Sequence, residues 1–365
     1  MWPAVPSLGN CRPTRARGSV TIVSGKGPAA AVPADRNREG RQIFVDALTE
    51  LAEASRNPRL RSILTPLTAP LEVAVRGRAG VGCTTVGAAL TAAGVPVTDA
   101  SAADVDVVVI AEALKPEDTT LIGASPRPTV VVLNKADLVG FGAGTPLATA
   151  HRRAAECRAL TGVPTVPMVG LLAAVTLEDD MLAALSALVH EPADLTSTDA
   201  FVRCAHPVPV SVRRRLLDAL DRFGIVHAVQ ALADGAEPAA LAGLLRRHSL
   251  VDRVVAQLDA ACAPLRYQRL RMAIVELRAL AARSGDERLT AFLAGDDAVL
   301  GTMAAAVDVV EAAGVPVDRG DDAGAHLRRA VHWRRYGRGP VVAVHRQCAA
   351  DITRGSLRLL ERCGE

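Results

Sequence analysis

The feature of this chain that most constrains its fold is an apolar run that leads directly into a glycine-rich turn. Residues 71–75 read Leu-Glu-Val-Ala-Val, and residues 77–84 read Gly-Arg-Ala-Gly-Val-Gly-Cys-Thr. A segment rich in Ala and Leu, suited to a helix, follows Thr85. A strand, a glycine turn and a helix in this order are typical of α/β domains, in which the helix packs back on a parallel sheet.

The turn has the spacing of a phosphate-binding loop, G-x-x-x-x-G-K-[ST], except that Cys83 stands in the lysine position. In such a loop the glycines let backbone N–H groups turn toward the phosphates, and the next helix points its positive end at them. The lysine would neutralise the outer phosphates, and the Ser/Thr hydroxyl would hold Mg²⁺. Arg76 and Arg78 lie beside the loop, but neither occupies the lysine position. The nucleotide contacts predicted here are Gly77, Gly80, Gly82, Cys83, Thr84 and Thr85.

A second motif follows a second apolar run. Residues 129–133 read Thr-Val-Val-Val-Leu, which is typical of a buried strand, and they end in Asn134-Lys135-Ala136-Asp137. An N-K-x-D sequence at a strand end resembles the guanine-reading motif of GTPases, in which the aspartate accepts from N1–H and the exocyclic amine while the lysine stem covers the base. The alternative is a polar turn that caps a helix.

The string from Val131 to Leu138 and the order of these elements resemble the GTPase domains of the translation-factor and dynamin-related class. More narrowly, they resemble the divergent dynamin-like GTPases of high-GC bacteria. The resemblance covers roughly residues 70 to 175 and is specific only at the N-K-x-D strand. It implies GTP or GDP with Mg²⁺ as the ligand. It also implies that the predicted strand Thr165–Gly170 ends at the loop beside the base.

The chain departs from that family between the two motifs. The family has a first switch segment there and a strand that ends in D-x-x-G, whose aspartate meets Mg²⁺. Asp99 can stand for this acid, which pairs it with Thr84 as the predicted metal ligands, but Ala102 replaces the glycine and the first switch has no room. The alternative for Asp99 is an ordinary turn residue.

Composition excludes several other classes of protein. The net charge of +3 is too small to indicate a nucleic-acid partner, and no basic stretch is interleaved with aromatic residues. The seven cysteines are scattered without metal-ligand spacing, which favours reduced thiols and a cytoplasmic location. Residues 1–18 lack the apolar core of a signal peptide, and no apolar run is long enough to span a membrane.

The rest of the chain predicts a tail and a helical region. Residues 1–40 carry Pro, Gly and Arg without periodicity and are expected to be a flexible tail. Residues 41–175 are expected to form the truncated α/β domain with a leading amphipathic helix, and residues 176–365 a helical bundle. Trp333 and Tyr336, next to arginines, could anchor a partner or lipid headgroups, with a contact inside the bundle as the alternative. Peripheral membrane contact is possible but unsupported, because the turn at residues 294–297 is acidic and argues against contact with anionic lipid.

The predicted fold is therefore a truncated P-loop GTPase-like α/β domain followed by a helical bundle. The leading functional hypothesis is a degenerate dynamin-like protein that binds guanine nucleotide and hydrolyses it slowly or not at all, so no residue is assigned a catalytic role and enzyme activity is left undecided. The alternative is a nucleotide-free pseudo-GTPase scaffold that acts through its bundle, with an active dynamin-like GTPase as a candidate partner. A third possibility is an active GTPase that a partner completes.

Overall fold

The computed structural model describes residues 33–140 and 145–364, and it contains one four-stranded parallel sheet in these ranges. The strands follow the chain in space, in the order β1 (Val73–Gly77), β2 (Val105–Ala111), β3 (Thr129–Asn134) and β4 (Thr165–Pro167). The apolar runs of β2 and β3 are buried from both sides, as is typical of parallel strands. Because all four strands are parallel, the loops that follow them meet at one edge of the sheet.

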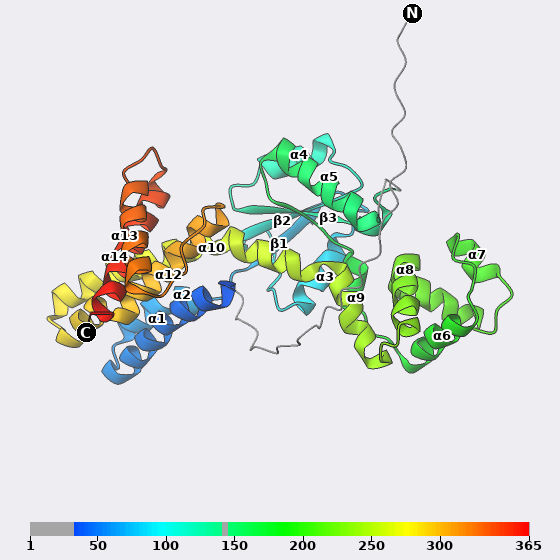
Figure 1. The fold of residues 1–365 in the computed structure, drawn as a ribbon, viewed down its shortest axis with the longest axis horizontal. Coiled ribbons are helices and arrows are strands. Elements are labelled where there is room, and N and C mark those ends of the chain that lie inside the picture. The colour runs from blue at the N-terminus through cyan, green and yellow to red at the C-terminus, as the bar shows by residue number, and fades with distance from the viewer. Residues whose placement is uncertain (1–32, 141–144, 365) are drawn as a thin grey trace, which may run out of the picture.

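Helices cover both faces of this sheet (Figure 1). On one face, the core contains residues of α4 (Pro116–Gly123) and α5 (Pro146–Thr161). On the other, it contains α3 (Cys83–Ala92) and the first half of α10 (Val251–Ser284). The predicted α/β class is therefore confirmed.

The free side of β1 carries much less structure than the side that pairs with β2. An isolated bridge joins Val73, the first residue of β1, to Val97. The chain then turns back, so that the Asp104 N–H donates to the Glu72 carbonyl at 2.8 Å. A single bridge stands where the resemblance leads one to expect a full strand.

A second group of helices attaches at the carboxyl edge of the sheet. It consists of α6 (Asp179–His190), α7 (Thr198–Arg203), α8 (Val210–Ala233) and α9 (Leu241–Ser249), with the short 3₁₀ turn η3 (Pro238–Ala240). Helices α8 and α9 contact η2 (Gly170–Leu172), the turn after β4. Another 3₁₀ turn, η1 (Ala136–Leu138), follows β3. Helices α6 to α9 share a hydrophobic core with α4 and α5.

A third group forms a separate bundle, on the left of Figure 1. Its core contains the second half of α10, from Tyr267 onward, and fully buries Trp333. The contact inside the bundle is therefore the correct alternative for Trp333. The other helices of this bundle are α1 (Pro33–Ser55), α2 (Pro58–Thr68), α11 (Glu287–Ala294), α12 (Asp296–Ala312), α13 (Ala323–Tyr336) and α14 (Ala343–Arg362).

This packing differs from the expected division at residues 40 and 175. The leading helix packs with the C-terminal bundle, because α1 lies against α2 and α12, and Phe44 and Leu48 are buried in the core of the bundle rather than against the sheet. The helical region after residue 176 splits into two groups that α10 connects. Of the predicted tail 1–40, residues 33–40 belong to α1 and residues 1–32 lie outside the described part of the chain. Hydrophobic periodicity marks a buried helix face but does not specify what covers it.

Candidate functional site

The loop between β1 and α3, residues 77–84, has the backbone geometry of a tight turn that ends at a helix start. Gly80 and Gly82 have φ values of 83° and 91°, which residues with a side chain rarely adopt. Gly82 is the N-cap of α3, and the first turn of that helix contains no acidic side chain to offset its positive end. A Cβ atom at Gly77 would lie 2.5 Å from the Val109 carbonyl oxygen and 2.9 Å from Cys83 Sγ. The loop is therefore tightly curled, with the Cys83 side chain close to its first glycine.

The two arginines beside this loop are both engaged by carboxylates. Arg78 donates from Nε to Asp118 Oδ1 at 2.7 Å, and Asp118 is fully buried on α4. Arg76 pairs with Asp106, which is also fully buried. Neither arginine is free to replace the missing lysine. Burial raises the pKa of the Cys83 thiol, so the residue in the lysine position is uncharged.

Asn134 connects the three loops at this edge of the sheet. Its Nδ2 donates to the Val81 carbonyl at 2.9 Å, and its Oδ1 accepts from the Gly170 N–H at 3.0 Å. The side chain is almost fully buried, and a Cβ atom on Gly82 would overlap its amide group. The end of β3 therefore fixes the loop after β1 and the turn after β4 at the same time.

The next residues of the motif extend this arrangement. Lys135 adopts a left-handed conformation, with φ of 56°, and its Nζ donates to the Gly80 carbonyl at 2.9 Å. Asp137 is half-buried in η1, and burial raises the pKa of its carboxyl group. The carboxylate of Asp221 raises this pKa further, whereas Lys135 lowers it. Asp221 lies on α8 in a non-helical conformation, so this part of α8 lies near Asp137.

The predicted metal ligands are not brought together. Thr84 is exposed at the start of α3, at the carboxyl edge of the sheet. Asp99 is exposed two residues after the Val97 bridge, where the chain turns back toward the amino edge. In the described residues, no cluster of three or more His, Cys, Asp or Glu side chains is arranged to hold a metal ion. These residues do not fit a joint Mg²⁺ site.

The remaining predicted site residues lie as follows. Thr85 is half-buried in the first turn of α3, close to Gly170. The strand expected at Thr165–Gly170 is confirmed only over Thr165–Pro167, which form β4, whereas Gly170 lies in η2 against Asn134. Sequence reasoning missed Asp118, the partner of Arg78. The only signal was an arginine inside a phosphate-type loop, which needs a counter-charge when no anion is present.

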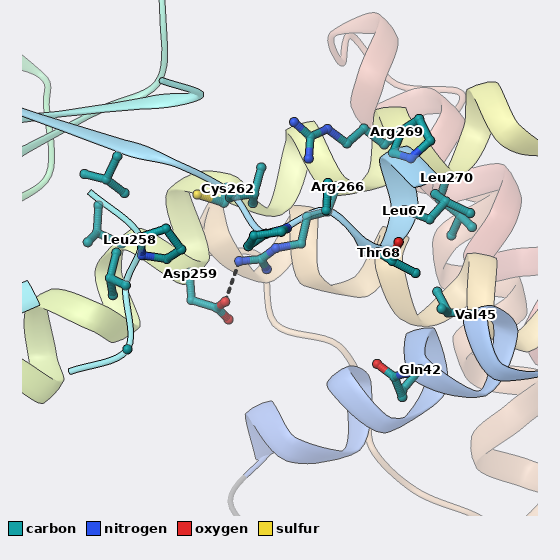
Figure 2. A pocket seen from close by; sticks show the side chains of 18 of the residues that line it. Gln42, Val45, Leu67, Thr68, Leu258, Asp259, Cys262, Arg266, Arg269 and Leu270 are labelled. Atoms are coloured by element: carbon teal, nitrogen blue, oxygen red, sulfur yellow. Dashed lines mark hydrogen bonds and ion pairs between the residues drawn. The ribbon is translucent and has the colours of Figure 1, made fainter. Parts of the chain in front are cut away.

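A separate cleft of about 380 Å³ lies at the other end of β1 (Figure 2). Its walls come from α1, α2, α10 and the loop before Val97, and include Val45, Leu67 and Leu270. Arg266 in this cleft pairs with Asp259, and Arg269 pairs with Asp104 at 2.6 Å. Because Val73 lines the cleft whereas the glycine loop follows Gly77, the cleft is not part of the Asn134 site.

Comparison with known proteins identified no relationship: no family model matches the chain, and no curated protein matches it. Among the described helices, none combines the length and the apolar character that crossing a membrane requires.

Proposed function

We propose that this chain is a degenerate dynamin-like protein that binds GTP or GDP and hydrolyses GTP slowly or not at all. The observation that carries this proposal is the pair of hydrogen bonds made by Asn134. A polar turn that only capped a helix would have no reason to bury an amide between two other loops. A nucleotide site needs these three loops at fixed distances, because one ligand must touch all of them.

In the proposed complex, different residues at the carboxyl edge of the sheet contact different parts of the nucleotide. The backbone N–H groups of residues 77–84 and the start of α3 bind the phosphates. The Asp137 carboxylate accepts from guanine, and the Lys135 stem covers the base. Adenine lacks the two donors that this carboxylate would require, so the site selects guanine.

Slow or absent hydrolysis follows from the charges around the loop. Phosphoryl transfer depends on cations that stabilise the developing negative charge. Cys83 supplies none, and Arg78 is held by Asp118. Thr84 and Asp99 do not meet, so these residues supply no paired metal ligands for that step.

The second candidate function is a scaffold that binds no nucleotide. The Arg78–Asp118 ion pair favours it, because this pair neutralises a cation of the loop within the protein itself. An active dynamin-like GTPase remains the proposed partner in that case. Neither candidate involves nucleic acid.

A titration of the purified chain with fluorescent GDP, GTP and ATP, with and without Mg²⁺, tests the proposal. We expect saturable binding of GDP and GTP but not ATP, with little dependence on Mg²⁺. Asp137→Asn should abolish the selectivity for guanine. Asp99→Asn is the matched control, and it should leave the affinity unchanged because Asp99 lies toward the other end of the sheet.

Two results would contradict the proposal. Equal GDP affinity in Asp137→Asn and the parent would show that the N-K-x-D motif does not read a base. The absence of binding up to about 1 mM nucleotide, the weak end of specific recognition, would favour the scaffold.

A further inference from the structure

A groove runs along the outer face of the second half of α10. Its lining extends from Pro264 to Ala282, a length of about 27 Å along a helix. Helix α14 borders one side of it, α11 borders the other, and the start of α12 lies between them. The section beside α14 has a volume of about 620 Å³, and the section beside α11 about 410 Å³. We call this feature the α10 groove.

Apolar side chains in this groove are exposed at helical spacing. Met272 is 56% exposed and Val275 is 60% exposed. Val344 of α14 lines the first section, and Leu293 of α11 lines the second. A row of apolar side chains between helical walls has the form of surfaces that receive one face of an amphipathic helix. A helix of about 18 residues would cover its length.

The rim of the groove is basic. Arg271 pairs with the buried Asp351 at 3.0 Å, so its charge is offset. Arg278 and Arg354 are exposed, and no ion pair joins either to another residue in the part of the chain that the structure describes. Glu276 is the one exposed acidic side chain among the described residues that line it. Because Arg278 and Arg354 outnumber Glu276, the groove combines an apolar floor with a small excess of positive charge.

We infer that the α10 groove binds an acidic amphipathic helix of another protein. The charge excludes two occupants from this same chain. Residues 1–32 contain four basic residues and no Asp or Glu. The exposed apolar ridge of α13, with Leu327 and Val331, carries arginines and would be repelled if a second copy presented it. This inference does not depend on nucleotide binding.

Two synthetic helical peptides of matched length test the inference. Both carry leucines at i, i+3, i+4 and i+7; one is flanked by glutamates and the other by lysines. Fluorescence anisotropy with the full chain should show binding of the acidic peptide alone. Val275→Asp should weaken this binding at least about tenfold, as for a central apolar contact. Leu327→Asp, at another exposed apolar position on α13, is the control and should leave binding unchanged.

A charge exchange separates specific docking from general hydrophobic adhesion. The double variant Arg278→Glu, Arg354→Glu should lose the acidic peptide and gain the lysine peptide. Because both arginines are exposed, the fold should survive, which far-UV circular dichroism checks.

Several outcomes would overturn the inference. One is no binding of the acidic peptide up to about 1 mM. Equal binding of both peptides, or binding that survives Val275→Asp, is another. Phosphatidylglycerol vesicles that bind with the same sensitivity to these variants would assign the groove to a lipid surface. Concentration-dependent dimerisation that Val275→Asp abolishes would assign it to a second copy.

Discussion

The carboxyl group of Asp137 is already partly removed from water before any ligand is present. Burial is the largest cause of its raised pKa, and the charge of Asp221 on α8 adds to it. The folded chain therefore binds a proton at this group more strongly than the unfolded chain does. Its contribution to stability is fully present below the ordinary Asp pKa of about 3.9 and is lost as the pH rises through the folded-state value. At neutral pH the ionised carboxylate is a cost to the fold, and a bound guanine would offset that cost with two donors.

The variant Asp137→Asn should consequently be more stable than the parent at neutral pH in the absence of nucleotide. Asparagine keeps the size of the side chain and removes the buried charge. The difference should vanish below about pH 3.9, where Asp137 is protonated in both states. Urea unfolding at several pH values measures it. A variant that is less stable than the parent at pH 7 would show that the carboxylate makes a compensating contact.

Two glycines, one at the N-cap of α3 and one in its middle, lie in opposite environments and give a matched pair. Gly82 has a left-handed conformation and lies against Asn134, whereas Gly87 in the middle of the helix has no atom within 4 Å of a built Cβ. Gly82→Ala should lower the free energy of unfolding by at least about 2 kcal/mol, from backbone strain and displacement of the amide. Gly87→Ala should raise it by about 0.5–1 kcal/mol, because alanine is the better helix former. Chemical denaturation measures both, and similar effects of the two changes would contradict the loop geometry.

Between α8 and α9, three aromatic rings form a stack at the joint beside η2. The rings of His227 and His248 are stacked at a centroid distance of 4.0 Å, and Phe223 packs edge-on against His227 at 4.4 Å. Burial lowers the pKa of both histidines; the charge of His248 adds to this at His227, and that of Arg247 at His248. The folded chain thus holds both rings neutral more strongly than the unfolded chain. Their contribution is present above about pH 6.5 and is lost as the pH falls through the folded-state values.

Lowering the pH should therefore weaken the packing of α9 against α8 before the carboxylates titrate. The urea midpoint of the parent should fall as the pH drops below about 6.5, and His248→Phe should reduce that fall because it keeps a stacked ring without a titrating group. His332→Phe changes an exposed histidine outside the stack and should keep the pH dependence of the parent. Identical pH profiles for the parent and His248→Phe would refute the assignment.

Across the whole molecule, α10 is the element that connects the sheet to the bundle. Its first half shares a core with the sheet through Val254 and Leu258, and its second half is buried in the bundle through Tyr267 and Leu277. Unfolding the first half of α10 would expose the sheet, and unfolding its second half would expose the core of the bundle. The two parts are therefore expected to unfold in one cooperative transition, although each has a core of its own.

The hydrogen bond from Tyr267 to Asp351, at 2.7 Å, offers a test of this coupling. Tyr267→Phe leaves the buried Asp351 with Arg271 alone and should cost about 1–3 kcal/mol. Tyr336→Phe, which removes a bond to His345 at a half-buried position, is the control and should cost less. Tryptophan fluorescence in a Trp2→Phe background follows Trp333 in the bundle, and far-UV circular dichroism follows all helices. Tyr267→Phe should shift both signals equally; separate shifts would show two independent domains.

Much of the fold could be predicted from the chain itself. The apolar runs at residues 71–75 and 129–133 coincide with much of β1 and β3, and the predicted helical region after residue 176 contains α6 to α14. The contact of Asn134 with the glycine loop was not itself predicted. It follows from the topology, because neighbouring parallel strands end at one edge of the sheet. The kink at Asp221 and the partner of Arg78 could not be read from the sequence.

The sequence alone determined which segments form strands and helices and which motifs end those strands, because β-branched runs, glycine turns and periodic apolar positions act over a few neighbouring residues. The tertiary structure decided what those segments meet. It pairs Arg78 with Asp118, places α1 in the C-terminal bundle and keeps Asp99 away from Thr84. Such contacts join residues far apart in the chain, and their energies depend on burial and distance, which local sequence patterns do not specify.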